Sequence, residues 1–293
     1  MDQPPCDRRR SLPLNEIVIV HGVRNWQPGT DPAVAAQRLA ASWQPSLVAG
    51  YADAGLQHLA VPDITAAYYA HHLNDEESQG VDEDIDRFAD DLQEAAYHWL
   101  VAAGLPPEPE EGQSWGRMPL RQALDLVARK RGVAPETLAR VIVAFLPEVY
   151  RYLSAPARRA RSRDAVAKAI RESGAKVVVA HSLGSVVAYE ALHANTDLTV
   201  EVLITLGSPL GLPGAVFDAL DPEPRNGRGA RPEVHRWTNI ADAGDLVALP
   251  RRLGDRFSVD HHDEMHMALV DFHTLPMYLS CGLTAAAMAP FTA

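Results

Sequence analysis

The chain has 293 residues, 47% of them apolar, which is enough for a well-buried core in one large domain or two small ones. Its 38 Asp and Glu residues outnumber its 27 Lys and Arg residues, and the formal charge of −11 argues against nucleic acid and anionic lipid surfaces as partners. No 18 consecutive apolar residues occur, which predicts no membrane span, and the first residues lack the apolar run of a secretory signal. We therefore expect a cytoplasmic protein.

The two cysteines agree with this expectation. Cys6 and Cys281 lie at opposite ends of the chain, and neither has metal-ligand spacing with its neighbours. A single disulfide stays open as an alternative, but a reduced compartment is the simpler interpretation.

The predicted elements alternate between strands and helices. Strands are predicted where short β-branched runs end in a turn, and helices where apolar residues repeat at helical spacing. In chain order we expect a loose tail over 1–14, a strand over 16–22, a helix over 32–49, a strand over 64–70, a helix over 81–100, a loop over 104–117, helices over 118–131, 135–153 and 158–174, a strand over 176–181 with a helix to 192, strands within 198–211 and 233–245, and a final helix over 273–288.

This alternation predicts an α/β fold, with a mainly parallel central sheet and helices on both faces. Residues 15–293 are expected to form a single domain. The span from about 105 to 158 is helical without an intervening strand, so it predicts a helical cap inserted over one edge of the sheet. Functional sites of such folds lie in loops at the carboxyl ends of the strands.

Ser182 stands at such a carboxyl end. It follows the strand "VVVAH" directly and precedes the helix-prone run "LGSVVAYEAL". A sharp strand-to-helix turn needs small residues two positions before and two after its tip, and these are Ala180 and Gly184. The new helix aims unsatisfied backbone N–H groups at the serine, so the amide of Leu183 is a candidate donor to an oxyanion. The pattern predicts that Ser182 is a nucleophile.

Here the chain resembles the α/β-hydrolase superfamily, specifically serine esterases and lipases whose nucleophile turn reads A-H-S-x-G. Ala replaces the first Gly of the G-x-S-x-G form. The resemblance covers the element order from about Glu16 to the C-terminus, apart from 105–158, and it implies a Ser, Asp, His order along the chain. It also implies a second oxyanion donor after the His21-Gly22 pair, where Val23 is our choice and Arg24 the next.

The resemblance indicates the acid and the base. "GDLVALP" is similar to an acid-bearing D-x-V-P segment, which favours Asp245, with Asp242 as the alternative. For the base, "FHTLPMYL" is similar to H-x-x-x-x-Y stretches that open the last helix of lipase-like proteins. This favours His273 over His261, His262 and His266. His181, beside the serine, lies on the strand side of the turn and is predicted to be a packing residue.

A metal site at His262 and His266 is the weaker interpretation, because the spacing is not H-E-x-x-H and no third ligand is well spaced. We expect no metal and no cofactor.

These residues predict acyl transfer to water from a small or lipid-like ester through an acyl-enzyme. A peptidase, thioesterase or acyltransferase would use the same residues. Two other hypotheses stay open: a catalytically silent scaffold that binds a ligand or partner, and a hydrolase switched on by a protein partner. Labelling of Ser182 by a fluorophosphonate discriminates among them.

Overall fold

The computed structural model describes residues 16–74, 84–106, 118–266 and 273–292. Its centre is a six-stranded sheet in the order β2-β1-β3-β4-β5-β6, in which every neighbouring pair is parallel. The predicted α/β class is confirmed. The strands are β1 (Ile17–Val20), β2 (Ile64–Ala67), β3 (Val177–His181), β4 (Val202–Leu206), β5 (Arg236–Asp242) and β6 (His261–Met265).

The central strands are buried on both faces, which explains their unbroken apolar sequences. Successive side chains of a strand point to opposite faces. In β1, Ile17 and Ile19 therefore join one core cluster, and Val18 and Val20 join the other. Helices cover each cluster, so the chain forms three layers.

The helices are α1 (Pro32–Asp53), α2 (Ala70–Leu73), α3 (Asp90–Ala102), α4 (Leu120–Arg131), α5 (Pro135–Ser154), α6 (Pro156–Ser173), α7 (Leu183–Ala194), α8 (Leu275–Ser280) and α9 (Gly282–Met288), with short 3-10 turns at 85–87, 217–219, 253–255 and 289–291. Helices α1, α8 and α9 pack on the face that carries Ile17 and Ile19, whereas α5, α6 and α7 belong to the other cluster. Asp31 caps the start of α1, because its Oδ1 accepts hydrogen bonds from the amides of Ala33 and Val34.

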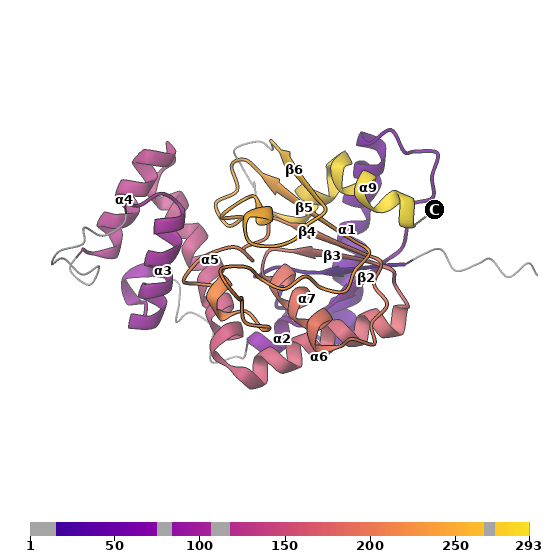
Figure 1. Cartoon of the computed structure of the whole chain (residues 1–293), viewed down its shortest axis with the longest axis horizontal. Helices are drawn as coiled ribbons and strands as arrows, with labels where there is room; N and C mark the ends of the chain where they lie inside the picture. Colours follow the sequence, from indigo (N-terminus) through magenta and orange to yellow (C-terminus); the bar gives the residue numbers. More distant parts are fainter. Residues whose placement is uncertain (1–15, 75–83, 107–117, 267–272, 293) are drawn as a thin grey trace, which may run out of the picture.

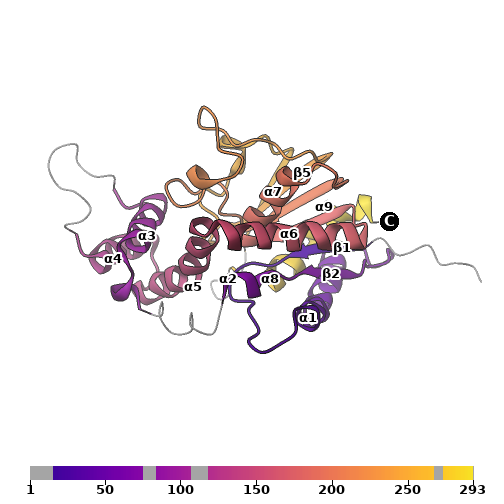
Figure 2. The same cartoon turned by 90° about the horizontal axis from the view of Figure 1, so that it is seen from below.

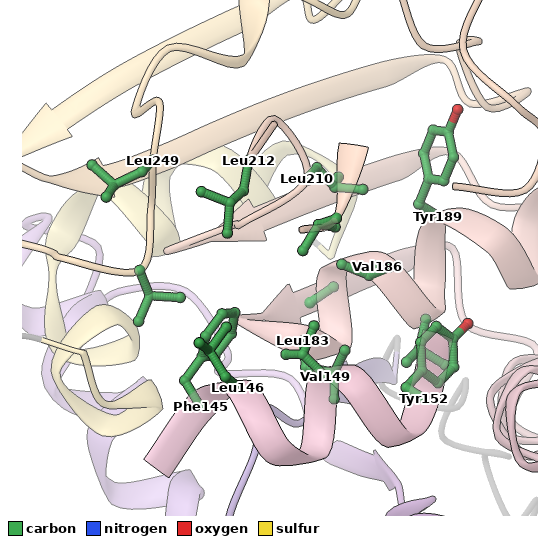
Figure 3. Close-up of a cluster of buried hydrophobic side chains, with 14 of the residues drawn as sticks. Phe145, Leu146, Val149, Tyr152, Leu183, Val186, Tyr189, Leu210, Leu212 and Leu249 are labelled. Carbon is green, nitrogen blue, oxygen red and sulfur yellow. The ribbon is translucent and has the colours of Figure 1, made fainter. Parts of the chain in front are cut away.

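Helices α3 and α4 lie at one end of the molecule, away from the sheet, and α5 runs between them and the sheet (Figures 1 and 2). Helix α5 packs on α7 through apolar side chains. Phe145, Leu146 and Val149 of α5 face Leu183 and Val186 of α7 (Figure 3). Helix α5 is therefore anchored directly beside the start of α7.

Several predicted boundaries differ from the structure. The segment predicted as one helix over 81–100 contains a 3-10 turn at Ile85–Arg87, extended backbone at Phe88 and then α3. The predicted strand 64–70 ends at Ala67, and Ala70 already begins α2. The tail predicted over 1–14 and most of the predicted loop 104–117 lie outside the described residues.

The final predicted helix is broken at Cys281, whose backbone is extended. The break lets the amide of Gly282 donate a hydrogen bond to Asp53 Oδ2 at 2.7 Å. A Cβ on Gly282 would lie 2.8 Å from the Ala54 nitrogen, so this glycine permits close packing of α9 on the end of α1.

Strand β6 was not predicted. Its sequence, HHDEM, is polar, and only Met265 is buried. Because β6 is an edge strand, its pairing with β5 depends on backbone hydrogen bonds and not on an apolar pattern.

Among the described residues, no helix combines the length and the apolar character that crossing a membrane requires.

Candidate active site

Ser182 occupies the turn between β3 and α7, at the carboxyl edge of the sheet. Its φ and ψ are 54° and −130°, a region that non-glycine residues rarely adopt. The Ser182 amide stays in the sheet by donating to the Leu206 carbonyl at 3.0 Å, while its carbonyl already accepts from the amide of Ser185 at 2.9 Å. The residue therefore belongs to the strand and the helix at once, which strains its backbone and holds its side chain at the rim.

Two glycines let the end of β1 approach this turn. A Cβ on Gly184 would lie 2.3 Å from the His21 carbonyl oxygen, and a Cβ on Gly22 would lie 2.7 Å from the Cβ of Ser182. Any larger residue at either position would force β1 and the turn apart. Gly22 and Gly184 are thus both required by the same close contact between the end of β1 and the turn at Ser182.

Ser182, His273 and Asp245 form a continuous chain of hydrogen bonds, which we call the trio. His273 Nε2 lies 2.8 Å from Ser182 Oγ, and His273 Nδ1 lies 2.7 Å from Asp245 Oδ2. In the sequence, Ser182 and His273 are 91 positions apart, and Asp245 and His273 are 28 positions apart. Ser182 follows β3, Asp245 follows β5, and His273 precedes α8. The geometry matches what a base needs to take a proton from a hydroxyl.

Asp245 is fully enclosed by hydrogen-bond donors. Its Oδ1 accepts from the amides of Val247 and Ala248, and its Oδ2 accepts from His273 Nδ1 and from the hydroxyl of Tyr278 at 2.7 Å. Burial opposes the charged form, but the attraction to His273 and these hydrogen bonds outweigh it and lower the pKa of Asp245 below its usual value. Asp245 is therefore a carboxylate near neutral pH.

Replacing Tyr278 by Phe removes one donor from this carboxylate. We expect the pKa of Asp245 to rise, because its carboxylate loses a hydrogen bond that stabilises the charged form, and we expect the effect on activity to be largest in acid. If the trio is catalytic, the acid limb of the pH dependence of kcat/KM should move to higher pH, by up to about one unit. Activity should thus fall more at pH 6 than at pH 8. A uniform loss at all pH values would indicate only a structural defect.

The candidate amides for binding an oxygen at the serine come from two places, Val23 in the loop after β1 and Leu183 at the start of α7. Val23 lines the pocket in front of Ser182. Within the described part of the chain, neither the Val23 amide nor the Leu183 amide donates a hydrogen bond to the protein. The Arg24 amide, our second choice from the sequence, donates instead to Glu148 Oε1 at 2.9 Å. The two preferred amides therefore remain available to a substrate oxygen.

His21 fixes the start of this loop. Its ring stacks on Tyr69 with centroids 4.2 Å apart, its Nδ1 lies 2.7 Å from the Gly22 carbonyl, and its Nε2 accepts from the Tyr69 amide. Burial lowers the pKa of His21 to about 4, more than its hydrogen bond to Gly22 raises it. The neutral ring is therefore part of the folded structure.

We expect this ring to make the fold sensitive to acid. Because the pKa is lower in the folded state, the stabilisation is complete above the ordinary value of 6.5 and disappears as pH falls through about 4. Between pH 7 and pH 4 the free energy of unfolding should drop by about 3 kcal/mol on account of His21. Urea unfolding of the wild type and of His21→Gln measures this. The difference between their free energies of unfolding should become smaller as the pH falls. A difference in the free energy of unfolding that does not change with pH would contradict this role of His21.

A pocket of about 650 Å³ opens over Ser182. Its lining combines residues of the β1 loop, helices α1 and α5, and the loops that carry the trio; they include Val23, Arg24, Trp43, Arg140, Val141, Phe145, His181, Val247, His273 and Leu275. Ser182 lies at its base with no exposed surface, and the side chain of His273 is 14% exposed. The Ser182 side chain is therefore buried beneath the other residues that line the pocket.

The alternatives that the sequence left open lie elsewhere. Asp242 Oδ1 accepts from the Gly244 amide at 2.7 Å and so braces the loop that holds Asp245. His261 and His262 belong to β6, where His262 contacts Asn239 and Glu264. In the described ranges, no three His, Cys, Asp or Glu side chains lie close enough together to hold a metal ion.

His181 is buried beside the trio, with its ring centroid 4.8 Å from that of His273. Burial, together with the charge of His273, lowers the pKa of His181 well below its usual value. It is neutral, and the hydrogen bond to the serine comes from His273.

Three residues beside the trio were not given their roles from the sequence. A Cβ on Gly207, whose φ is 53°, would lie 2.8 Å from Asp245 Oδ2 and 3.1 Å from the His273 ring, so only glycine leaves room there. The Tyr278 hydroxyl donates to Asp245, and Glu148 accepts from the Arg24 amide of the β1 loop. The signal for Glu148 was a lone carboxylate within the apolar repeat of α5, between Phe145 and Val149.

No protein-family model matches the chain, and no curated protein sequence matches it.

Proposed function

We propose that the chain is a serine hydrolase of the α/β-hydrolase superfamily that cleaves a carboxylic ester. The observation that carries this proposal is the hydrogen-bonded trio, with 2.8 Å between His273 Nε2 and Ser182 Oγ and 2.7 Å between His273 Nδ1 and Asp245 Oδ2. The all-parallel sheet, the strained strand-to-helix turn and the pocket over Ser182 support the same proposal.

In the proposed reaction, His273 takes the proton of Ser182 as Oγ attacks the ester carbonyl carbon. Asp245 keeps the proton of Nδ1 in place and stabilises the positive imidazole. The carbonyl oxygen becomes negative and accepts hydrogen bonds from the amides of Val23 and Leu183. His273 then gives its proton to the departing alcohol, which leaves an acyl group on Ser182.

Water completes the proposed cycle. His273 removes a proton from a water molecule that attacks the acyl-enzyme, and the carboxylic acid leaves as Ser182 regains its proton. Helix α5, with its pocket-facing Val141, Ala144 and Phe145, is proposed to act as the cap that limits the size of the acyl group. The apolar lining suits an ester with a hydrophobic part.

Hydrolysis of p-nitrophenyl esters from acetate to palmitate tests the proposal, with peptide and thioester panels beside it. We expect turnover of at least one ester chain length by the wild type and its loss in Ser182→Ala. Equal turnover by the wild type and Ser182→Ala would contradict the proposed nucleophile. Turnover confined to the thioester or peptide panel would keep the nucleophile and change the substrate class.

A further inference from the structure

The pocket over Ser182 carries two positive charges that no step of the proposed reaction uses. Arg24 enters from the β1 loop and Arg140 from α5, and both side chains are exposed. The other ionisable groups of the described lining are His181, which is held neutral by burial, and His273 of the trio. No Asp or Glu of the described residues lines this pocket.

Carboxylates are abundant in this chain, in which acidic residues outnumber basic ones by 38 to 27. Arg159, Arg163 and Arg171 each lie within 4.0 Å of a carboxylate. In the described part of the chain, neither Arg24 nor Arg140 has a carboxylate oxygen within that distance of its side chain. Two arginines without a carboxylate oxygen within 4.0 Å of their side chains therefore line the same pocket as the serine.

The contacts of Arg140 leave most of its donors unused. Its Nε lies 3.3 Å from the Glu136 carbonyl and its Nη2 lies 3.5 Å from Thr137 Oγ1, both at the long end of hydrogen bonding. Thr137, Arg140, Val141 and Ala144 follow one another at helical spacing, and all four line the pocket. Arg140 is thus presented by the same face of α5 that supplies the apolar wall.

Arg24 is positioned by its backbone. Its φ is 63°, and its amide is held by Glu148 Oε1. Glu148 is 7% exposed and is not among the residues that line the pocket, whereas Arg24 is exposed and lines it. Burial raises the pKa of the Glu148 carboxyl, and the hydrogen bond from the Arg24 amide and the charges of Arg151 and Arg24 only partly oppose it.

On the basis of the proposed hydrolase function, we propose that the substrate carries an oxyanionic group, a carboxylate or a phosphate, which Arg24 and Arg140 bind beside the ester. The planar guanidinium offers paired donors that match both groups. The apolar part of the same substrate then lies along Trp43, Val141 and Phe145. The pocket thereby selects amphiphilic anions in a protein whose net charge would otherwise repel them.

Protection of Ser182 from a fluorophosphonate tests this without a known substrate. Three ligands with six carbon atoms each are compared: hexanoate, hexyl phosphate and the neutral hexanamide. We expect one or both anions to halve the labelling rate at a concentration about tenfold lower than hexanamide. The stronger anion distinguishes the carboxylate from the phosphate as the preferred group. Equal protection by the amide and both anions would overturn the proposal.

We call the ratio of the hexanamide concentration to the anion concentration that halves the labelling rate the advantage of the anions. Arg140→Gln and Arg24→Gln should each reduce this advantage, and Arg140→Lys should retain part of it. The matched control is Lys168→Gln, which removes one positive charge from the C-terminal half of α6, where the Lys168 side chain is 72% exposed. It should keep the full advantage. If both arginine variants keep it as well, the arginines do not bind the anion and the proposal fails.

Salt provides an independent readout, because raising the ionic strength from about 0.05 M to about 0.5 M should reduce the advantage of the anions and leave protection by hexanamide unchanged. An advantage that is insensitive to salt would contradict binding by exposed charges.

The two proposals fail in different ways. A labelled Ser182 that all three ligands protect equally overturns only the anion site. An unlabelled Ser182 in folded protein overturns the hydrolase and, with it, this inference.

Discussion

Replacing Asp245 by asparagine is expected to lower kcat by about 10⁴-fold on any ester that the wild type hydrolyses. The reason is that the two carboxylate oxygens of Asp245 have different partners, backbone amides at Oδ1 and His273 at Oδ2. Oδ1 faces the amides of Val247 and Ala248, so the asparagine oxygen must take that side. Its NH₂ group then faces His273 Nδ1 and donates to it, which leaves the proton of the imidazole on Nε2. His273 can no longer accept the proton of Ser182.

Asp242→Asn is the matched control, because Asp242 was the alternative acid and lies in the same loop. Its oxygen can still accept from the Gly244 amide, so the loop should remain in place. We expect less than a tenfold change in kcat for this variant. Steady-state kinetics of both variants, with circular dichroism to verify folding, make the comparison. A larger loss in Asp242→Asn than in Asp245→Asn would contradict the assignment of the acid.

Replacing Glu190 by alanine is expected to destabilise the fold by about 3 to 5 kcal/mol. Glu190 is completely buried in α7, where its carboxylate accepts from the Tyr152 hydroxyl at 2.6 Å, from Arg159 Nε at 2.7 Å and from the Asp221 amide at 3.1 Å. These donors come from α5, α6 and the loop after β4. Without the carboxylate, the largely buried guanidinium of Arg159 keeps the Ala219 carbonyl but loses its charged partner, and the buried hydroxyl of Tyr152 loses its acceptor.

Urea unfolding measures this loss, and a surface pair provides the control. The side chains of Arg171 and Asp197 are 45% and 61% exposed, so Asp197→Asn should cost less than about 1 kcal/mol. In the double variant Glu190→Leu with Arg159→Met, most of the stability should return, because no charge is left unpaired. Equal costs for Glu190→Ala and Asp197→Asn would show that the buried network contributes little.

The sequence was most informative where chemistry and local structure coincide. Ser182, Asp245 and His273 each follow a predicted strand or precede a predicted helix, and parallel strands bring their carboxyl ends to one edge of the sheet. The α/β class thus predicted the edge of the sheet at which Ser182 lies, whereas the choice of Asp245 and His273 came from the resemblance to the α/β-hydrolase superfamily. The small residues beside the turn were predicted from sterics, and the contacts of Gly184 with the end of β1 have the same physical origin.

Other features depended on packing that no local pattern encodes. The role of Glu148 requires α5 to lie against the β1 loop, and that of Tyr278 requires α8 to pack beneath the loop after β5. Both follow from how distant segments meet. The break at Cys281 depends on contact with α1, whereas β6 lacks an apolar pattern because it is an edge strand.

The most direct test of the proposed hydrolase is the intact mass of the protein after incubation with a fluorophosphonate, followed by peptide mapping. We predict one phosphonyl group per chain, located on Ser182, absent from Ser182→Ala and slow to form in Asp245→Asn. Folded wild-type protein that stays unmodified, or a label that persists in Ser182→Ala, would contradict the account.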